Sequence, residues 1–265
     1  MKRIAYAAFW LLFTLGLAYF PAQAQQQSAT APQAGKAATS AVLTPTQTVR
    51  EFYQALRAKR FRDAFMLSTY RPAVETLTPE EMADLTPDFA ATAANIPEKL
   101  DLSDEVITGD SATVLVNLAE PDEPAVPKEM KLRRDNGAWQ IADEEEPQVK
   151  KDGKNYFFRL RLETHHGEAE EMMARIYKAQ VVYQLQNKQF GSMEALIKAE
   201  LLPADIKETL STGYQYRIVV ATGGKSYAAY AEPARYGRTG KFSYYIDQTG
   251  RLQSGDTSGQ PLKAR

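Results

Sequence analysis

Residues 132–143 read LRRDNGAWQIAD, and this stretch predicts a hairpin between two antiparallel strands. The central Asn136 and Gly137 form a turn signal, because both residues tolerate the positive φ angles of a tight hairpin turn. Upstream, apolar residues alternate with more polar ones over 112–118, which is typical of a half-buried strand. We therefore expect a meander of antiparallel strands up to Ile141.

Helical signals precede these strands. Thr44-Pro45-Thr46-Gln47 has the form of a capping box with proline at the first helical position, and Thr78-Pro79-Glu80-Glu81 repeats that pattern. After the first box, apolar residues recur at the spacing of one helical face. A second short helix is expected over 61–67. Three helices followed by antiparallel strands indicate an α+β domain. The apolar face of the first helix consists of Val49, Phe52, Tyr53 and Leu56.

This order of elements, with its LRRDNGAWQIAD ending, resembles the nuclear transport factor two-like fold. That cone-shaped, cystatin-like domain is shared with ketosteroid isomerases and many exported bacterial domains. The resemblance covers about residues 44–145 and implies a cone that can hold a pocket. An isomerase-like site needs a carboxylate in an apolar cavity and a hydrogen-bond donor for the developing oxyanion.

After residue 142 the alternating pattern of the strands ends, and an acidic run, a further strand-like stretch and then helical patterns follow. The acidic run Asp143–Glu146 reads as a solvated linker, and Tyr156–Leu162 alternates apolar and basic residues in the manner of a strand. A helix is expected from about Gly167 to Asn187, and Ser192 is expected to cap another. Four further antiparallel strands are predicted over 214–221, 226–232, 242–247 and 251–254.

This second half also resembles a known family. The segments EAEEMMARIYKAQVVYQLQNKQFGSMEALIKAELL (168–202), GYQYRIVV (213–220) and YAAYAEPARYGRTGKFSYYIDQTGRL (227–252) are similar to the globular half of type IV pilin-like and pseudopilin-like proteins. The resemblance implies a pilin-like head over about residues 167–256. Pilin-like proteins join this head directly to an N-terminal apolar helix that carries a glutamate. Here the apolar segment lies far upstream and has no glutamate, so we expect the head to act as a separate module.

The N-terminus indicates export. Lys2 and Arg3 precede the apolar run Ile4–Phe20, and Ala22 and Ala24 occupy the small-residue positions before a cleavage site at Gln25. We therefore expect a signal peptide over 1–24 and a periplasmic or secreted protein. The run also reaches the lower limit for a membrane span, so an uncleaved anchor is the alternative. Residues 25–43 have the composition of a flexible linker.

Composition narrows the function. The chain of 265 residues has 32 Lys and Arg against 33 Asp and Glu, so it lacks the basic field that nucleic-acid binding requires. It has no cysteine, which excludes disulfides and thiolate metal sites. No motif for nucleophilic catalysis or for phosphate or dinucleotide binding is present. We expect no cofactor and no metal site.

A few side chains remain as candidates. In the first domain, Tyr53 and Tyr70 are possible donors into the cone, beside Asp63 or Asp88, although tyrosine on an apolar stripe is usually a core residue. Adjacent histidines, His165-His166, lack a third nitrogen ligand and favour an exposed loop over a metal site.

The second domain offers a tyrosine-rich sheet. Seven tyrosines lie between Tyr214 and Tyr245, which suits ordinary strand packing or a surface that binds peptide or glycan. Tyr244 and Tyr245 are neighbours in one strand and must point to opposite faces. Asp247-Gln248-Thr249-Gly250 has too few oxygens for a calcium loop and reads as a hairpin turn. The candidate ligand-surface residues are Tyr53, Tyr70, Tyr214, Tyr216, Tyr244 and Tyr245.

These observations predict a two-domain α+β protein: a nuclear transport factor two-like domain over 44–165 and a pilin-like domain over 166–265. The expected function is a non-enzymatic one in the cell envelope, by interaction with a protein or a small ligand. One alternative is small-molecule binding or isomerase-like chemistry in the first domain's cone. Another is an accessory subunit of a pilus or secretion system.

Overall fold

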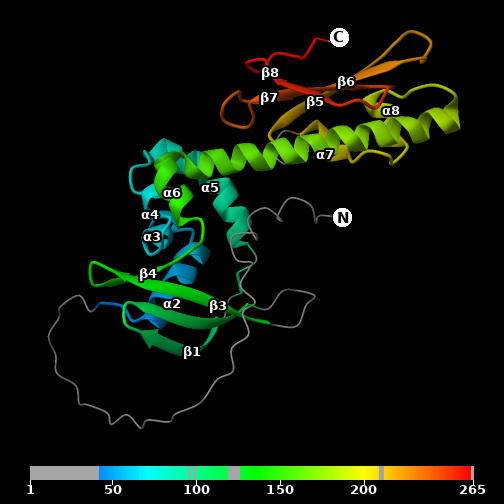
Figure 1. Cartoon of the computed structure of the whole chain (residues 1–265). Coiled ribbons are helices and arrows are strands. Elements are labelled where there is room, and N and C mark those ends of the chain that lie inside the picture. Colours follow the sequence, from blue (N-terminus) through cyan, green and yellow to red (C-terminus); the bar gives the residue numbers. More distant parts are fainter. Residues whose placement is uncertain (1–41, 95, 98–99, 119–125, 209–211, 264–265) are drawn as a thin grey trace, which may run out of the picture. The chain divides into compact units, whose positions relative to one another are not determined.

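A computed structural model describes residues 42–94, 96–97, 100–118, 126–208 and 212–263 (Figure 1). The chain divides into two compact units between Lys154 and Asn155. Each unit contains helices and its own four-stranded antiparallel sheet, which confirms the α+β fold in two parts. The expected cleavage residues Ala22, Ala24 and Gln25 lie outside the described residues.

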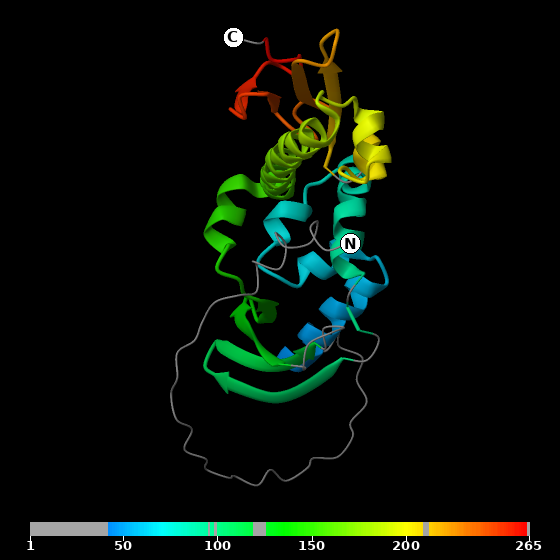
Figure 2. The ribbon, with the colours of Figure 1, turned by 90° about the vertical axis from the view of Figure 1, so that its right-hand side faces the viewer.

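The N-terminal unit has a sheet with the strand order β1-β2-β3-β4, so neighbours in sequence are neighbours in space. Short helices precede the sheet and one follows it. Helix α2 contacts β1, β2 and β4 and crosses the sheet in Figure 2. The elements are α2 (Pro45–Arg57), α3 (Phe61–Met66), α4 (Arg71–Val74), α5 (Pro79–Ala93), β1 (Asp101–Thr108), β2 (Ser111–Leu118), β3 (Val126–Asp135), β4 (Ala138–Ile141) and α6 (Glu146–Asp152).

Both predicted capping boxes are confirmed. The Thr44 hydroxyl accepts from the Gln47 backbone N–H at 3.2 Å, and the Gln47 side chain accepts from the Thr44 N–H at 2.9 Å. Thr78 and Glu81 make the same reciprocal pair at the start of α5. Each box satisfies two backbone donors that a helix start leaves without a partner. These helix starts are therefore fixed by local sequence.

The core of this unit lies between the helices and one face of the sheet. Its aromatic cluster is formed by Phe61 and Phe65 of α3 with Phe89 of α5, whose ring centroid lies 4.9 Å from that of Phe65. The predicted hairpin is confirmed, because Asn136 and Gly137 both have positive φ between β3 and β4. The sheet's buried apolar side chains alternate as expected: Ala112, Val114, Val116, Met130, Leu132, Trp139 and Ile141.

The C-terminal unit packs a long helix and a short one on a sheet with the order β5-β6-β7-β8. The Ser192 side chain accepts from the Ala195 N–H, as predicted for the N-cap of α8. The elements are η2 (Gly153–Asn155, a 3-10 turn across the division), α7 (Tyr156–Asn187), α8 (Met193–Lys198), η3 (Ala204–Lys207), β5 (Tyr214–Val220), β6 (Tyr227–Pro233), β7 (Phe242–Asp247) and β8 (Gln253–Asp256).

Two expectations about the middle of the chain are wrong. Residues Tyr156–Leu162 are the first two turns of α7 and not a strand, so the expected boundary at 165/166 falls inside this helix. A short run of apolar and basic residues fits either period, and here the run is continuous with the helical stretch that ends at Asn187. Gly167 lies within α7 and does not begin it.

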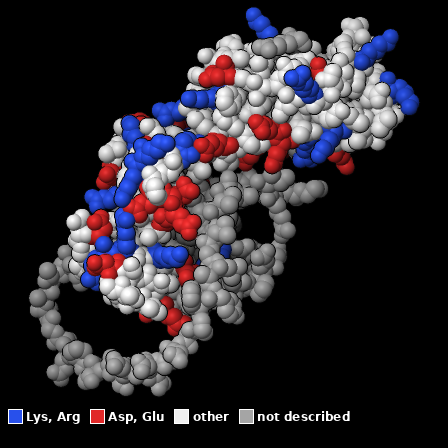
Figure 3. Space-filling model, viewed as in Figure 1, with Lys and Arg blue, Asp and Glu red and all other residues white. Residues whose placement is uncertain are grey.

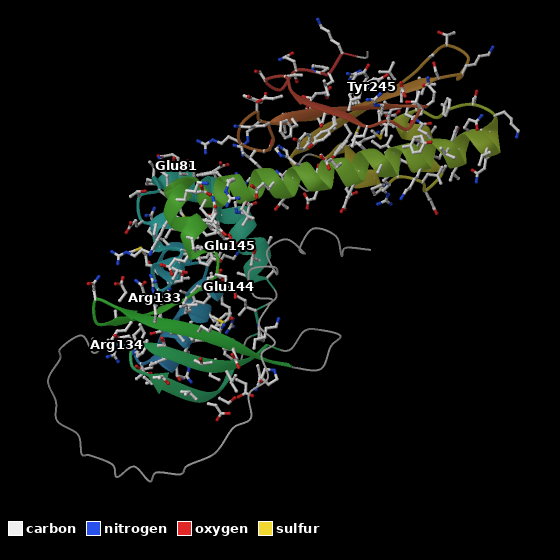
Figure 4. The ribbon with its side chains drawn as sticks, in the orientation of Figure 1. Glu81, Arg133, Arg134, Glu144, Glu145 and Tyr245 are labelled. Atoms are coloured by element: carbon white, nitrogen blue, oxygen red, sulfur yellow. The ribbon has the colours of Figure 1, made fainter. Side chains whose placement is uncertain are left out.

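The acidic run is also structured. The Asp143 carboxylate accepts from the Glu145 N–H at 2.8 Å, and Glu146 begins α6. The Glu146 carboxylate lies 2.7 Å from the Arg133 guanidinium on β3 and also pairs with Lys150 one helical turn later. Figure 4 labels Glu144, Glu145 and Arg133 in this region. The run connects the sheet to α6 and is not a solvated linker.

The core of the C-terminal unit contains one fully buried polar side chain of α7. The Gln180 amide nitrogen donates to the Gly191 carbonyl at 2.7 Å, and the Gln180 amide oxygen accepts from the Gly191 N–H at 2.9 Å. A Cβ at position 191 would lie about 3.0 Å from the Tyr183 ring, so glycine suits this close approach. This pair fixes the turn that leads into α8.

Within the described parts of the chain, no helix is both long and apolar enough to cross a membrane.

Lys and Arg are interspersed with Asp and Glu over the visible face of each unit (Figure 3).

Candidate functional site

The outer face of the second sheet, which we define as the face opposite α7, carries a row of side chains from three strands. Arg217 of β5 pairs with Tyr230 of β6, and Tyr230 pairs with Tyr245 of β7. The Arg217 guanidinium carbon lies 4.2 Å from the centre of the Tyr230 ring. The ring centroids of Tyr230 and Tyr245 are 5.3 Å apart in an edge-on arrangement. We call these three residues the outer-face row.

The assignment of faces follows from burial. Tyr214, Ala229, Ala231, Tyr244 and Ile246 belong to the core cluster that also contains α7 side chains. Since successive side chains of a strand point to opposite faces, the residues of the outer-face row must lie on the other side. Figure 4 labels Tyr245 on the sheet of the C-terminal unit.

Charged groups border this row. The Glu232 carboxylate lies 3.6 Å from an Arg217 guanidinium nitrogen, and burial raises the pKa of Glu232 while Arg217 opposes that shift. The Tyr245 hydroxyl donates to the Asp247 carboxylate at 3.1 Å. Burial, and then this hydrogen bond, raise the pKa of Tyr245. The arrangement offers stacking and hydrogen bonding, which are the usual means of recognition.

Of the four tyrosines that sequence analysis named in this domain, the structure places only Tyr245 on the outer face. Tyr214 and Tyr244 are fully buried beneath α7, and Tyr216 lies partly buried on the same side. Burial is the main cause that raises the pKa of each of these three hydroxyls. Tyr214 and Tyr244 are core residues and Tyr216 packs against the same core, so none of the three belongs to the outer face. The prediction that Tyr244 and Tyr245 point to opposite faces is confirmed.

Sequence reasoning missed Arg217, Tyr230 and Glu232 as members of this face. Their alignment depends on the register between β5 and β6, which the turn at Gly223 and Gly224 sets. Both glycines have positive φ in the loop between Ala221 and Ser226, a conformation that glycine adopts without steric cost. Counting outward from this turn was the signal that could have found the row.

The candidate donors of the first domain are buried as well. The Tyr53 hydroxyl contacts the Met130 sulfur at 3.7 Å, and burial raises its pKa. Tyr70 packs edge-on against Phe65. Asp63 pairs with Arg60 at the helix surface and does not enter the core.

A further carboxylate, that of Asp143, lies near Tyr70. Asp143 follows β4, and the backbone of 67–69 hydrogen-bonds to Ile141 of this strand, which brings Tyr70 to the side of Asp143. Burial raises the pKa of Asp143, while the Glu145 backbone N–H and the nearby Tyr70 hydroxyl act to lower it. The pair joins a half-buried carboxyl group to a phenol. Sequence reasoning missed it, because Asp143 belongs to the acidic run that was interpreted as a linker.

The two histidines lie on α7 and not in an exposed loop. His165 Nδ1 donates to the Thr239 carbonyl at 2.9 Å, since a carbonyl can only accept. His166 Nε2 accepts from the Lys241 N–H at 3.0 Å. Both rings therefore fasten the chain between β6 and β7 to the helix. Among the described residues, no group of three or more His, Cys, Asp or Glu has an arrangement that could hold a metal ion.

The hairpin interpretation of residues 247–250 is confirmed. The Asp247 carboxylate accepts from the Thr249 N–H and from the Thr249 hydroxyl, and Gly250 has a φ of +74°. This is an Asx-type turn, in which the carboxylate caps its own backbone.

Comparisons with known proteins give a single weak likeness to report. A search of solved structures matched the crystal structure of a protein named as an NTF2-like transpeptidase from Campylobacter jejuni. The identity is 13%, the match covers 37% of this chain and 96% of that chain, and the TM-score is 0.26. No family model matches the chain. No curated protein matches it either.

Proposed function

We propose that this protein is an exported, non-enzymatic component of the cell envelope that binds a protein or small ligand through the outer-face row. The observation that carries the proposal is the alignment of Arg217, Tyr230 and Tyr245 across three paired strands. The N-terminal pattern Lys2 to Ala24 supports export to the periplasm or beyond. A nuclear transport factor two-like first unit and a pilin-like second unit are part of the same proposal.

The chemistry of the row favours recognition. Arginine and tyrosine are enriched where proteins bind partners, because they offer large contact areas and directional hydrogen bonds. Tyr230 is partly exposed and the Arg217 side chain is 49% exposed, whereas Tyr245 is only 6% exposed and packs edge-on against the Tyr230 ring. Glu232 and Asp247 add acceptors at the border of the row. A ligand with an apolar or aromatic group and hydrogen-bond donors would fit this surface.

Site-specific photo-crosslinking in the native host tests the proposal. A photoreactive amino acid is placed at position 230 of the full chain, and at exposed Arg175 on α7 as a matched control. We expect an envelope component to be crosslinked from position 230 and not from 175, with a yield that falls when Arg217→Ala is added. Equal yields from both positions, or no effect of Arg217→Ala, would refute the assignment of this face.

A second candidate function uses the cone of the first unit. The observation that favours it is a half-buried carboxyl, Asp143, near the buried Tyr70, which the backbone bonds between 67–69 and Ile141 bring to the same side. A carboxyl group whose pKa is raised by burial, beside a hydroxyl, supplies two of the groups that isomerase-like proton transfer uses. A panel of small apolar ketones, screened by thermal shift, tests it with Asp143→Asn and Tyr70→Phe. A ligand whose stabilising effect is lost in both variants, and kept in Asp63→Asn, would support the cone.

A further inference from the structure

The chain after β8 reverses its direction at once. Gln260 N–H donates to the Thr257 carbonyl at 3.1 Å, and the two residues between them, Ser258 and Gly259, have φ angles of +54° and +80°. Two consecutive positive φ angles inside a four-residue turn are typical of a type I′ hairpin. The residues that follow therefore run back beside β8. We call Gln260–Lys263 the C-terminal strap.

The strap and its turn cover part of the outer face. The Leu262 side chain lies 3.6 Å from the place that a Cβ on Gly255 would take. Gly255 pairs with Ser243 of β7, and the Thr257 hydroxyl lies 2.9 Å from the Ser243 hydroxyl, from which it accepts because its own proton goes to the Gln260 carbonyl. Ser243 lies on the face away from α7 and yet is fully buried. Thr257 and Leu262 both lie over this part of the face.

The strap is held to its turn at Gln260, whose N–H donates to the Thr257 carbonyl and whose carbonyl accepts from the Thr257 hydroxyl. Asp256 accepts from the Tyr236 hydroxyl at 2.9 Å and from the Ser258 N–H at 3.1 Å, which fixes the turn. Within the strap itself, Leu262 is only partly buried and Lys263 is exposed. Pro261 has no N–H to offer to a strand ladder. The strap thus occupies the edge of β8 without completing a fifth strand.

We propose that the edge of β8, with the outer face around Ser243 and Gly255, binds an extended peptide with an apolar side chain, and that the strap occupies this position in the free protein. Addition of an extended segment to a sheet edge is a general mode of peptide recognition, with alternate side chains giving specificity. This inference rests on the proposed function, because it names the class of partner for the same face. Leu262 marks where the apolar side chain of a partner would lie.

The test uses the strap itself as the probe. The chain is shortened to end at Asp256, and a synthetic peptide, TSGQPLK, supplies residues 257–263 in trans. We expect the peptide to shift the backbone amide signals of Ser243 and Gly255 in NMR spectra of the shortened chain. In the full chain the tethered strap competes at a local concentration of about millimolar, so the peptide should bind at least tenfold more weakly.

A matched pair of variants separates strap release from truncation. Leu262→Asp in the full chain should free the site and restore peptide binding toward that of the shortened chain, whereas Lys263→Asp should leave it closed. A folded shortened chain without peptide-induced shifts would overturn the proposal, as would full and shortened chains that bind the peptide equally. The assay needs no envelope component, so its failure would leave the crosslinking result at position 230 to be judged separately.

Discussion

Removal of the buried amide of Gln180 should destabilise the C-terminal unit strongly. In Gln180→Ala, the Gly191 N–H and the Gly191 carbonyl both lose their partner, because the same side chain serves both groups. Gln180 has no exposed surface, so water does not reach this position in the native packing. The turn that leads into α8 then has two backbone groups without a hydrogen bond.

The magnitude follows from the number of groups affected. A buried polar group left without a partner costs about 1–3 kcal/mol, so two groups cost about 2–6 kcal/mol. A typical domain has a free energy of unfolding of about 5–15 kcal/mol, so this change removes a large part of it. Gln180→Met keeps most of the side-chain volume and loses both hydrogen bonds. It therefore separates the cost of the two unpaired backbone groups from the cost of a cavity.

Urea denaturation, followed by circular dichroism, measures the effect. The control is Gln186→Ala, an exposed glutamine of the same helix, which should change stability by less than about 0.5 kcal/mol. The reasoning is refuted if Gln180→Met is as stable as the wild type, because the hydrogen bonds to Gly191 would then contribute nothing. Entry of a water molecule would place the measured cost at the lower end of the range.

Other predictions concern pH and close packing. Burial raises the pKa of Asp143, so its ionised form is disfavoured in the folded state. The variant Asp143→Asn should therefore have a larger free energy of unfolding than wild type at pH 7. Denaturation curves should show this gain disappearing below about pH 4, where the carboxyl group is protonated in both states. Burial lowers the pKa of His166, and only the neutral ring can accept from the Lys241 N–H. The wild-type protein should therefore lose stability as the pH falls below about 6.5. Thermal melts of His166→Gln should lack this loss. A Cβ at position 240 would overlap the Tyr214 hydroxyl, so Gly240→Ala should cost about 1–3 kcal/mol in chemical denaturation, with partial recovery when Tyr214→Phe is added.

Local sequence was sufficient for the helix starts and the tight turns. Thr44 and Thr78 each make their reciprocal bonds within four residues, and Asn136-Gly137 turns where the positive φ preference places it. These features need no distant contact, so they can be predicted without knowledge of the fold. The same holds for Ser192 at the start of α8.

Features that depend on packing could not be predicted in this way. The segment Tyr156–Leu162 fits a strand and a helix equally well by pattern, and its continuity with the rest of α7 appears only in the structure. Composition showed that tyrosines were abundant but not on which face of the sheet each of them lies. Tyr230 and Tyr245 were separated from Tyr214 and Tyr244 only by strand register and by the position of α7.

Two contacts in the C-terminal unit give a means of recognising related chains. Gly240 leaves room for the Tyr214 hydroxyl, and Gly213, with a φ of +67°, leaves room for the His165 ring. Each glycine is separated from its partner by more than twenty residues, so neither pair forms a local motif. We expect divergent homologues to exchange both members of a pair together or to keep both. Such covariation would identify this unit in sequences too distant for alignment of the tyrosine-rich strands.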